Sequence, residues 1–125
     1  QGADVVYAAA GGTGVGVLQA AADADILSIG VDANQNYMHP GKVLTSMLKR
    51  VDLAVYNAFS EGESLTTGFN VMGLAEDGVG YALDEHNESL VSAKMVSTLE
   101  AEKAKIVSGQ IKVHDYMSDN SCPVK

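Results

Sequence analysis

The sequence is poor in cysteine, proline and basic residues, and it contains no tryptophan. Its single cysteine, Cys122, has no second cysteine with which to form an internal disulfide bond. The 8 basic residues are outnumbered by 16 acidic ones, which gives a formal net charge of −8, and they form no stripe that could follow a phosphate backbone. Nucleic acid is therefore not an expected partner.

Long apolar runs are also missing. No run approaches the roughly 20 residues of a membrane-spanning helix, and residues 1–4 lack the basic and then apolar order of a signal peptide. The 125 residues are nevertheless 46% hydrophobic and contain only 2 prolines, as is typical of folded globular proteins. We therefore expect one globular domain, or part of one.

Short apolar runs typical of strands alternate along the chain with segments whose apolar residues have helical spacing. This alternation predicts an α/β fold. Residues 4–10 form an apolar run close to glycines, which favours a buried strand, and residues 26–31 form a second such run. Between them, residues 13–24 have the apolar spacing of a helix. Strand, helix and strand in this order predict a βαβ unit with two parallel strands and a right-handed crossover.

The rest of the chain continues this alternation. Glycine, proline and asparagine mark its loops, and apolar periodicity marks its helices and strands. The predicted elements are a loop over 33–42, a strand over 43–48, a helix over 51–59, two short strands within 69–83 around a turn at 76–78, a helix over 91–106 capped by Asn87 or Ser89, and a strand over 111–114.

The turn after the first predicted strand holds four glycines within residues 11–16. Backbone N–H groups converge where a strand meets a helix, so the turn suits either a ligand or only a tight change of direction. A dinucleotide fingerprint would need Gly or Ala where Gln19 or Val17 stands, and a P-loop would need Lys in place of Val17. Both phosphate motifs fail, and the turn alone leaves the two interpretations open.

Polar residues follow the second and third predicted strands. Asp32 lies at the carboxyl end of the second strand, where ligands bind in open parallel sheets, and its carboxylate suits a pair of sugar hydroxyls. Lys49 follows the third strand and could donate to a ligand or to the Asp32 carboxylate. Asn34 and Gln35 could add amide contacts. The structural alternatives are that Asp32 caps the loop, that Lys49 and Arg50 are a solvated pair, and that Asn34 or Gln35 orders the loop.

Signals for catalysis, metal binding or a cofactor are weak. His39, His86 and His114 have neither the spacing of metal ligands nor that of a base and its nucleophile. The acidic residues Asp84 and Glu85 are interpreted as solvated. We therefore predict no catalytic residue, no metal site and no cofactor.

Several segments carry ordered motifs rather than isolated residues. They are GADVVYAAAGGTG at 2–14, IGVD at 29–32, VLTSMLKR at 43–50, GLAEDGVG at 73–80 and the segment 84–87. Together they resemble the basic membrane protein family, the purine-nucleoside receptor lipoproteins of bacterial ABC transporters. The resemblance covers essentially the whole chain.

The resemblance implies a partial type I periplasmic-binding-protein fold, with a Rossmann-like parallel sheet and flanking helices. Such a receptor closes on a nucleoside without changing it chemically and delivers it to an ABC transporter permease. In the family, an acidic residue at the position of Asp32 holds the ribose, as do a glycine main chain near Gly11 and Gly12 and a lysine at the position of Lys49. Tyr7 lies near the position of an aromatic residue that contacts the base.

The resemblance also implies that residues 1–125 are the carboxyl-terminal portion of a two-lobe, membrane-anchored, extracytoplasmic lipoprotein. Residues 50–68 are then expected to dock on the amino-terminal lobe, so the apolar face of the predicted helix 51–59 should be exposed in this chain or covered by another. Two alternatives remain. A nucleotide-cofactor enzyme domain has the same element order but not this glycine spacing, and the sugar-sensing domain of a transcription regulator would need a basic DNA-binding segment.

Overall fold

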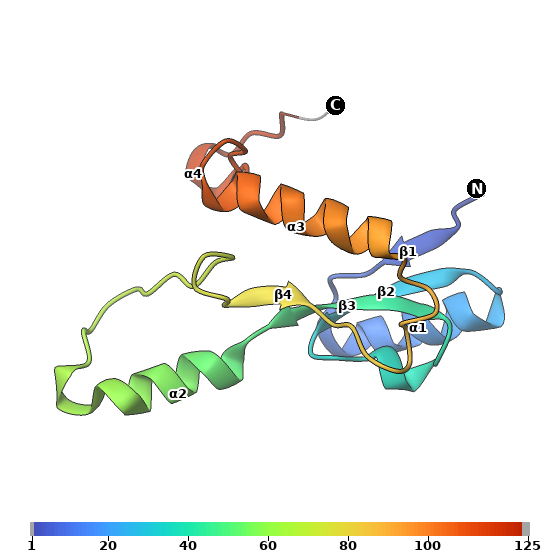
Figure 1. Ribbon diagram of the computed structural model, residues 1–125, viewed down its shortest axis with the longest axis horizontal. Helices are drawn as coiled ribbons and strands as arrows, with labels where there is room; N and C mark the ends of the chain where they lie inside the picture. The colour runs from blue at the N-terminus through green and yellow to red at the C-terminus, as the bar shows by residue number, and fades with distance from the viewer. Residues whose placement is uncertain (1, 124–125) are drawn as a thin grey trace.

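The computed structural model describes residues 2–123, which form a four-stranded sheet with helices on both faces (Figure 1). The strands are β1 (Val5–Tyr7), β2 (Leu27–Asp32), β3 (Val43–Lys49) and β4 (Val79–Tyr81). The α-helices are α1 (Gly14–Asp23), α2 (Val51–Glu61), α3 (Ala93–Val107) and α4 (Tyr116–Asp119), and the 3-10 turns are η1 (Gly11–Thr13), η2 (Asn36–Met38) and η3 (Gly62–Ser64).

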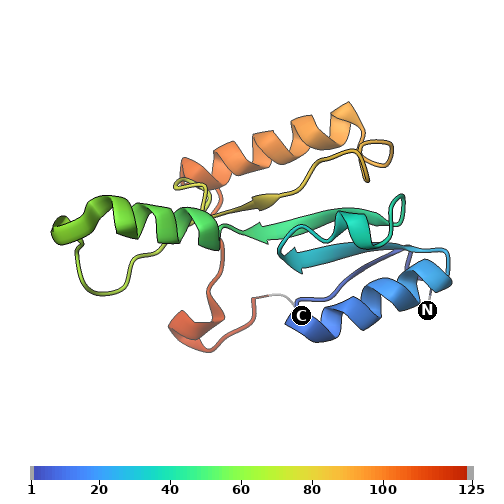
Figure 2. The same cartoon turned by 90° about the horizontal axis from the view of Figure 1, so that it is seen from below.

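The sheet has the strand order β1-β2-β3-β4. Strands β1, β2 and β3 are parallel, as the βαβ pattern predicts, and β4 pairs with β3 in the antiparallel direction. Helix α1 packs on one face through Leu18 and Ala21, which are 2% and 4% exposed, and α3 lies over the other face (Figures 1 and 2). The predicted open parallel sheet with flanking helices is therefore confirmed.

The connection from β2 to β3 crosses the sheet without an α-helix. Residues 33–42 return the chain to the start of β3 through η2, over small polar residues of the strands. Ser28, Ser46 and Asn36 are each 0% exposed. Part of the interior is therefore polar and held by hydrogen bonds, whereas the apolar core is small and includes Val31 and Val43.

Helix α2 projects away from the sheet as an arm (Figures 1 and 2). The chain leaves the sheet after β3 and returns before β4, and no residue of α2 is buried. Val55, Tyr56 and Phe59 are 50%, 70% and 83% exposed. The apolar face of α2 is therefore exposed, as expected. Its docking on an amino-terminal lobe stays a prediction.

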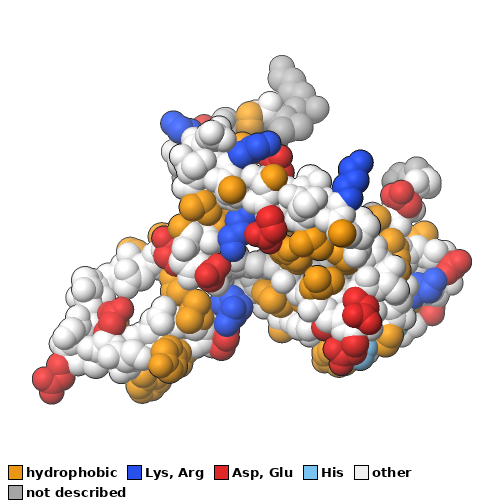
Figure 3. Space-filling model, viewed as in Figure 1, with side chains coloured by type: hydrophobic (Ala, Val, Ile, Leu, Met, Phe, Trp, Pro, Cys, Tyr) orange, Lys and Arg blue, Asp and Glu red, His pale blue; other side chains and the backbone are white. Residues whose placement is uncertain are grey.

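Helix α3 begins after Ser92, whose hydroxyl accepts a hydrogen bond from the Met95 N–H at 3.2 Å. The predicted caps Asn87 and Ser89 are wrong, because Ser92 is the cap, and the amide of the buried Asn87 donates instead to the carbonyls of Leu44 and Ala82. An open pocket of about 400 Å³ lies between part of α3 and the sheet. Hydrophobic side chains line this gap at the surface (Figure 3).

Two predicted strands are absent from the described part of the chain. Residues 69–75 and 111–114 have the apolar residues of predicted strands, but neither segment pairs with another strand among residues 2–123. Phe69 and Val113 are correspondingly exposed, because no neighbouring ladder orders these segments. None of the described helices is both long and apolar enough to cross a membrane.

Candidate functional site

Asp32 and Lys49 meet at the carboxyl ends of β2 and β3, which they terminate. The Lys49 ammonium lies 2.7 Å from Oδ1 of Asp32, and the two side chains are 57% and 45% exposed. The sequence predicted this contact as one of the options for Lys49. An ammonium has three donors and a carboxylate about four acceptor positions, so both groups retain capacity for a ligand.

The glycine turn lies at the same edge of the sheet, because it follows β1 and the first three strands are parallel. Gly11 adopts a φ of 52°, and a Cβ atom on Gly11 or Gly12 would meet nothing within 4 Å. The backbone here is exposed and open to a ligand. Tyr7 ends β1 just before the turn and is 50% exposed, so its ring is also accessible.

The two amide residues after Asp32 both bond within the chain. Gln35 accepts a hydrogen bond from the Val31 N–H at 2.9 Å through Oε1, and its own N–H donates to the Ser46 hydroxyl at 3.0 Å. The Asn34 amide donates to Oδ2 of Asp84 at 2.7 Å. Both residues therefore order the loop, and a direct ligand contact by Gln35 stays a prediction.

Asp84 anchors the loop that follows Asp32. It accepts hydrogen bonds from the Asn34 and Asn36 amides and from the His86 N–H, at 2.7, 3.1 and 2.9 Å. The bond from Asn34 lowers the pKa of the Asp84 carboxyl below its usual value, against the opposing effect of desolvation. The interpretation of Asp84 as a solvated charge is wrong, since the residue is half-buried and its partners Asn34 and Asn36 lie about fifty residues away, beyond any local pattern.

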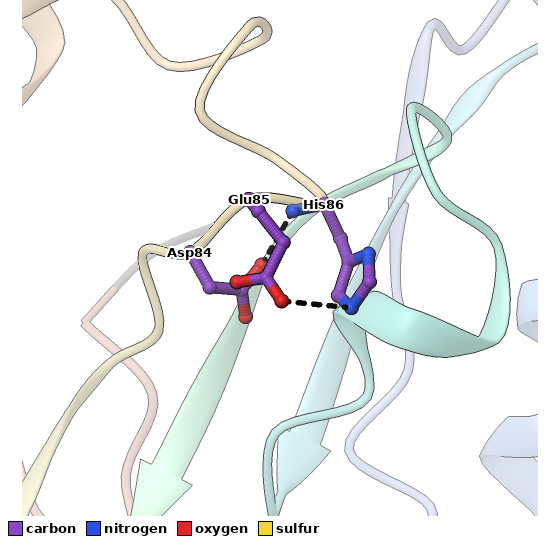
Figure 4. Close-up of side chains that lie close together, drawn as sticks. All are labelled: Asp84, Glu85 and His86. Atoms are coloured by element: carbon purple, nitrogen blue, oxygen red, sulfur yellow. Dashed lines mark hydrogen bonds and ion pairs between the residues drawn. The ribbon is translucent and has the colours of Figure 1, made fainter.

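Asp84, Glu85 and His86 bring their ligand-capable atoms within 4.8 Å of one another (Figure 4). The His86 Nε2 lies 3.8 Å from Oε1 of Glu85. Both carboxylate oxygens of Asp84 already accept internal hydrogen bonds, so the loop contacts account for its position. We assign this cluster no metal-binding role.

Comparisons with known proteins agree with this arrangement. The chain is 37% identical over 118 residues to basic membrane protein D of Borreliella burgdorferi, an alignment that covers 90% of this chain and 34% of that protein. It is 40% identical over 89 residues to an uncharacterised lipoprotein of Pyrococcus furiosus, covering 65% of this chain and 22% of that protein.

A crystal structure of an ABC transporter system solute-binding protein from Aeropyrum pernix superposes with a TM-score of 0.77 at 30% identity, over 91% of this chain and 41% of that protein. The chain thus spans about a third of the length of basic membrane protein D. Residues 1–116 match the Bmp family, described as ABC transporter substrate-binding protein PnrA-like. The chain therefore belongs to the Bmp family of ABC transporter substrate-binding proteins.

Proposed function

We propose that this chain is the carboxyl-terminal, ligand-gripping part of a two-lobe receptor that captures a purine nucleoside for an ABC transporter permease. The observation that carries the proposal is the exposed Asp32 and Lys49 pair beside the glycine turn. These groups share the sheet edge where α/β proteins bind ligands. The family match supports binding of a small solute, and the site chemistry supports a sugar-bearing one.

Each site residue has a defined task in this proposal. The Asp32 carboxylate accepts hydrogen bonds from the two ribose hydroxyls, and the Lys49 ammonium donates to a ribose oxygen or a base acceptor. Gly11 and Gly12 let the ligand approach the main chain closely. The half-exposed ring of Tyr7 offers an aromatic face to the base. Binding and release require no catalytic step, so the receptor is not an enzyme.

The α2 arm supplies the contact to the other lobe. Residues 50–68 contain the exposed side chains Val55, Tyr56 and Phe59. Full burial of one large apolar side chain contributes about 1.5–3 kcal/mol of stabilisation. Since the matched relatives are about three times as long as this chain, the amino-terminal lobe is the surface we propose for these side chains. A relative named as a lipoprotein supports a membrane-anchored, extracytoplasmic location for the full-length receptor.

Calorimetric titration of the full-length receptor tests the ligand class. Adenosine, guanosine and inosine are expected to bind. Cytidine and free ribose should bind more weakly, because they lack a purine to stack on the ring of Tyr7. Tight binding of a dinucleotide, with no binding of purine nucleosides, would favour the nucleotide-cofactor alternative and refute the proposal. Preference for a free sugar would favour a sugar-sensing domain instead.

A further inference from the structure

Asp32 occupies a strained turn at the end of β2. Its φ is 70°, and the Ala33 N–H donates to the Val31 carbonyl oxygen at 2.9 Å, across this single residue. A hydrogen bond between residues i and i+2 around a positive φ defines the rare form of the γ-turn. A residue other than glycine remains in such a conformation only where its surroundings impose it.

The surroundings of Asp32 form a continuous hydrogen-bond network. The Val31 N–H donates to Oε1 of Gln35 at 2.9 Å, and the Gln35 N–H donates to the Ser46 hydroxyl at 3.0 Å. The same hydroxyl donates to Oδ1 of Asn36 at 2.8 Å. The side chain of Gln35 thus ties the residue before Asp32 to the loop after it, and Ser46 ties that loop to β3.

The network is closely packed. Ser46 and Asn36 are 0% exposed, and no buried side-chain nitrogen or oxygen in residues 2–123 lacks a partner. A Cβ atom on Gly30 would lie 2.6 Å from Oγ of Ser46 and 2.9 Å from Oε1 of Gln35, so no side chain fits between strand and loop there. Because the network is closely packed and its buried polar atoms all have hydrogen-bond partners, the loop is held in one conformation.

We infer that Ser46 and Gln35 are positioning residues that hold the strained turn at Asp32 and thereby set the affinity of the site for its ligand. Ser46 is fully buried and so acts through the backbone of the loop rather than by contact with the ligand. The inference rests on the proposed role of Asp32 in binding. It also gives Gln35 a task that does not require it to touch the ligand.

Ser46→Ala in the full-length receptor tests the inference, with Ser28→Ala as the matched control. Both serines are 0% exposed on neighbouring strands, but the Ser28 hydroxyl makes only a 3.4 Å contact to the Lys42 carbonyl. Amide hydrogen exchange without ligand should become faster at Val31 and Ala33 in Ser46→Ala and stay unchanged there in Ser28→Ala. Equal exchange in the two variants overturns the positioning role.

Calorimetry with inosine, adenosine and guanosine then connects the turn to binding. The Kd should rise about fivefold in Ser46→Ala, the factor that corresponds to about 1 kcal/mol, which is the contribution of one of the two hydrogen bonds made by the Ser46 hydroxyl. It should stay unchanged in Ser28→Ala. Faster exchange with an unchanged Kd overturns the link to affinity. If the wild type binds none of these nucleosides, the proposed function fails, while the exchange result still decides the positioning role.

A second pair of variants covers the case in which Ser46→Ala does not fold. Gln35→Met keeps the length of the side chain but removes the acceptor for the Val31 N–H. Gln19→Met alters an exposed glutamine whose side chain donates to Asp23 in its own helix. Exchange at Val31 should be faster in Gln35→Met alone. Unchanged exchange in both variants overturns the role of Gln35.

Discussion

Replacement of Asp32 by asparagine should separate ligand affinity from stability. Asparagine keeps the size of the side chain and tolerates a positive φ, so the strained turn at Asp32 is not the property that changes. The substitution removes the negative charge that faces Lys49 and replaces one carboxylate oxygen by a donor. The variant therefore tests the charge of the site and leaves its backbone unchanged.

The exposure of the pair determines the expected effect on stability. At 45% and 57% exposure, the Asp32 and Lys49 side chains form a surface ion pair, which contributes about 0–1 kcal/mol. Each hydrogen bond that the Asp32 carboxylate accepts from a ligand contributes about 1.5–3 kcal/mol, or a factor of about 10–150 in Kd. The loss of affinity should therefore exceed the loss of stability.

Asp25→Asn provides a matched control just before the other end of β2. Asp25 also has a positive φ, of 60°, and also pairs with a lysine, Lys42, but it precedes β2 and so lies at the opposite end from Asp32. We expect calorimetric titration of the full-length receptor with inosine to show weak binding for Asp32→Asn and unchanged binding for Asp25→Asn. Urea unfolding of both variants measures the change in stability.

Two outcomes would refute this reasoning. Wild-type affinity in Asp32→Asn would remove Asp32 from the binding site and leave it as a turn residue. Equal losses of affinity in Asp32→Asn and Asp25→Asn would show that the effect reflects charge or stability of the whole molecule and not a local contact.

Two further predictions concern the segment around β4. Gly78→Ala should lower the free energy of unfolding by about 1–3 kcal/mol, because the new Cβ atom would overlap the backbone of Met72, whereas Gly80→Ala, with open space at its Cβ, should leave stability equal or higher in thermal unfolding. Stability should also fall as the pH drops below the ordinary Asp value of 3.8, since the hydrogen bond from Asn34 lowers the folded-state pKa of Asp84. A group with a depressed folded-state pKa contributes its full stabilisation above its unfolded pKa and loses it as the pH falls through the folded one. Asp84→Asn should weaken this acid dependence in urea unfolding measured across that range, and an unchanged profile would contradict the assignment.

The parallel strands and the contact between Asp32 and Lys49 were predictable because each depends on a simple rule. Short apolar runs mark buried strands, and residues that end neighbouring parallel strands lie at one edge. The polar network under the Asp32 loop follows no such rule. Asn36 meets Ser46 and Asp84 only after the β2 to β3 connection has folded back over the sheet, and nothing in the sequence around Asn36 indicates this.

The incorrect predictions have a common physical cause. A strand requires a partner for its backbone hydrogen bonds, and the apolar residues in 69–75 and 111–114 do not show whether a partner exists. The cap prediction failed for a related reason. Asn87 has the side chain of a helix cap, but its amide donates at 2.9 Å to the Leu44 carbonyl and at 3.0 Å to that of Ala82, so long-range contacts occupy it. Local patterns identify the groups that can bond and leave their partners undetermined.

The site and the arm are connected by a very short piece of chain. Lys49 ends β3 and α2 begins at Val51, so one residue separates the ammonium that faces Asp32 from the helix that carries the exposed apolar side chains. The residue between them, Arg50, donates its N–H to the Gly78 carbonyl oxygen at 2.8 Å and so ties the outgoing chain to the returning one. A surface that fixes α2 therefore also restrains the backbone of Lys49.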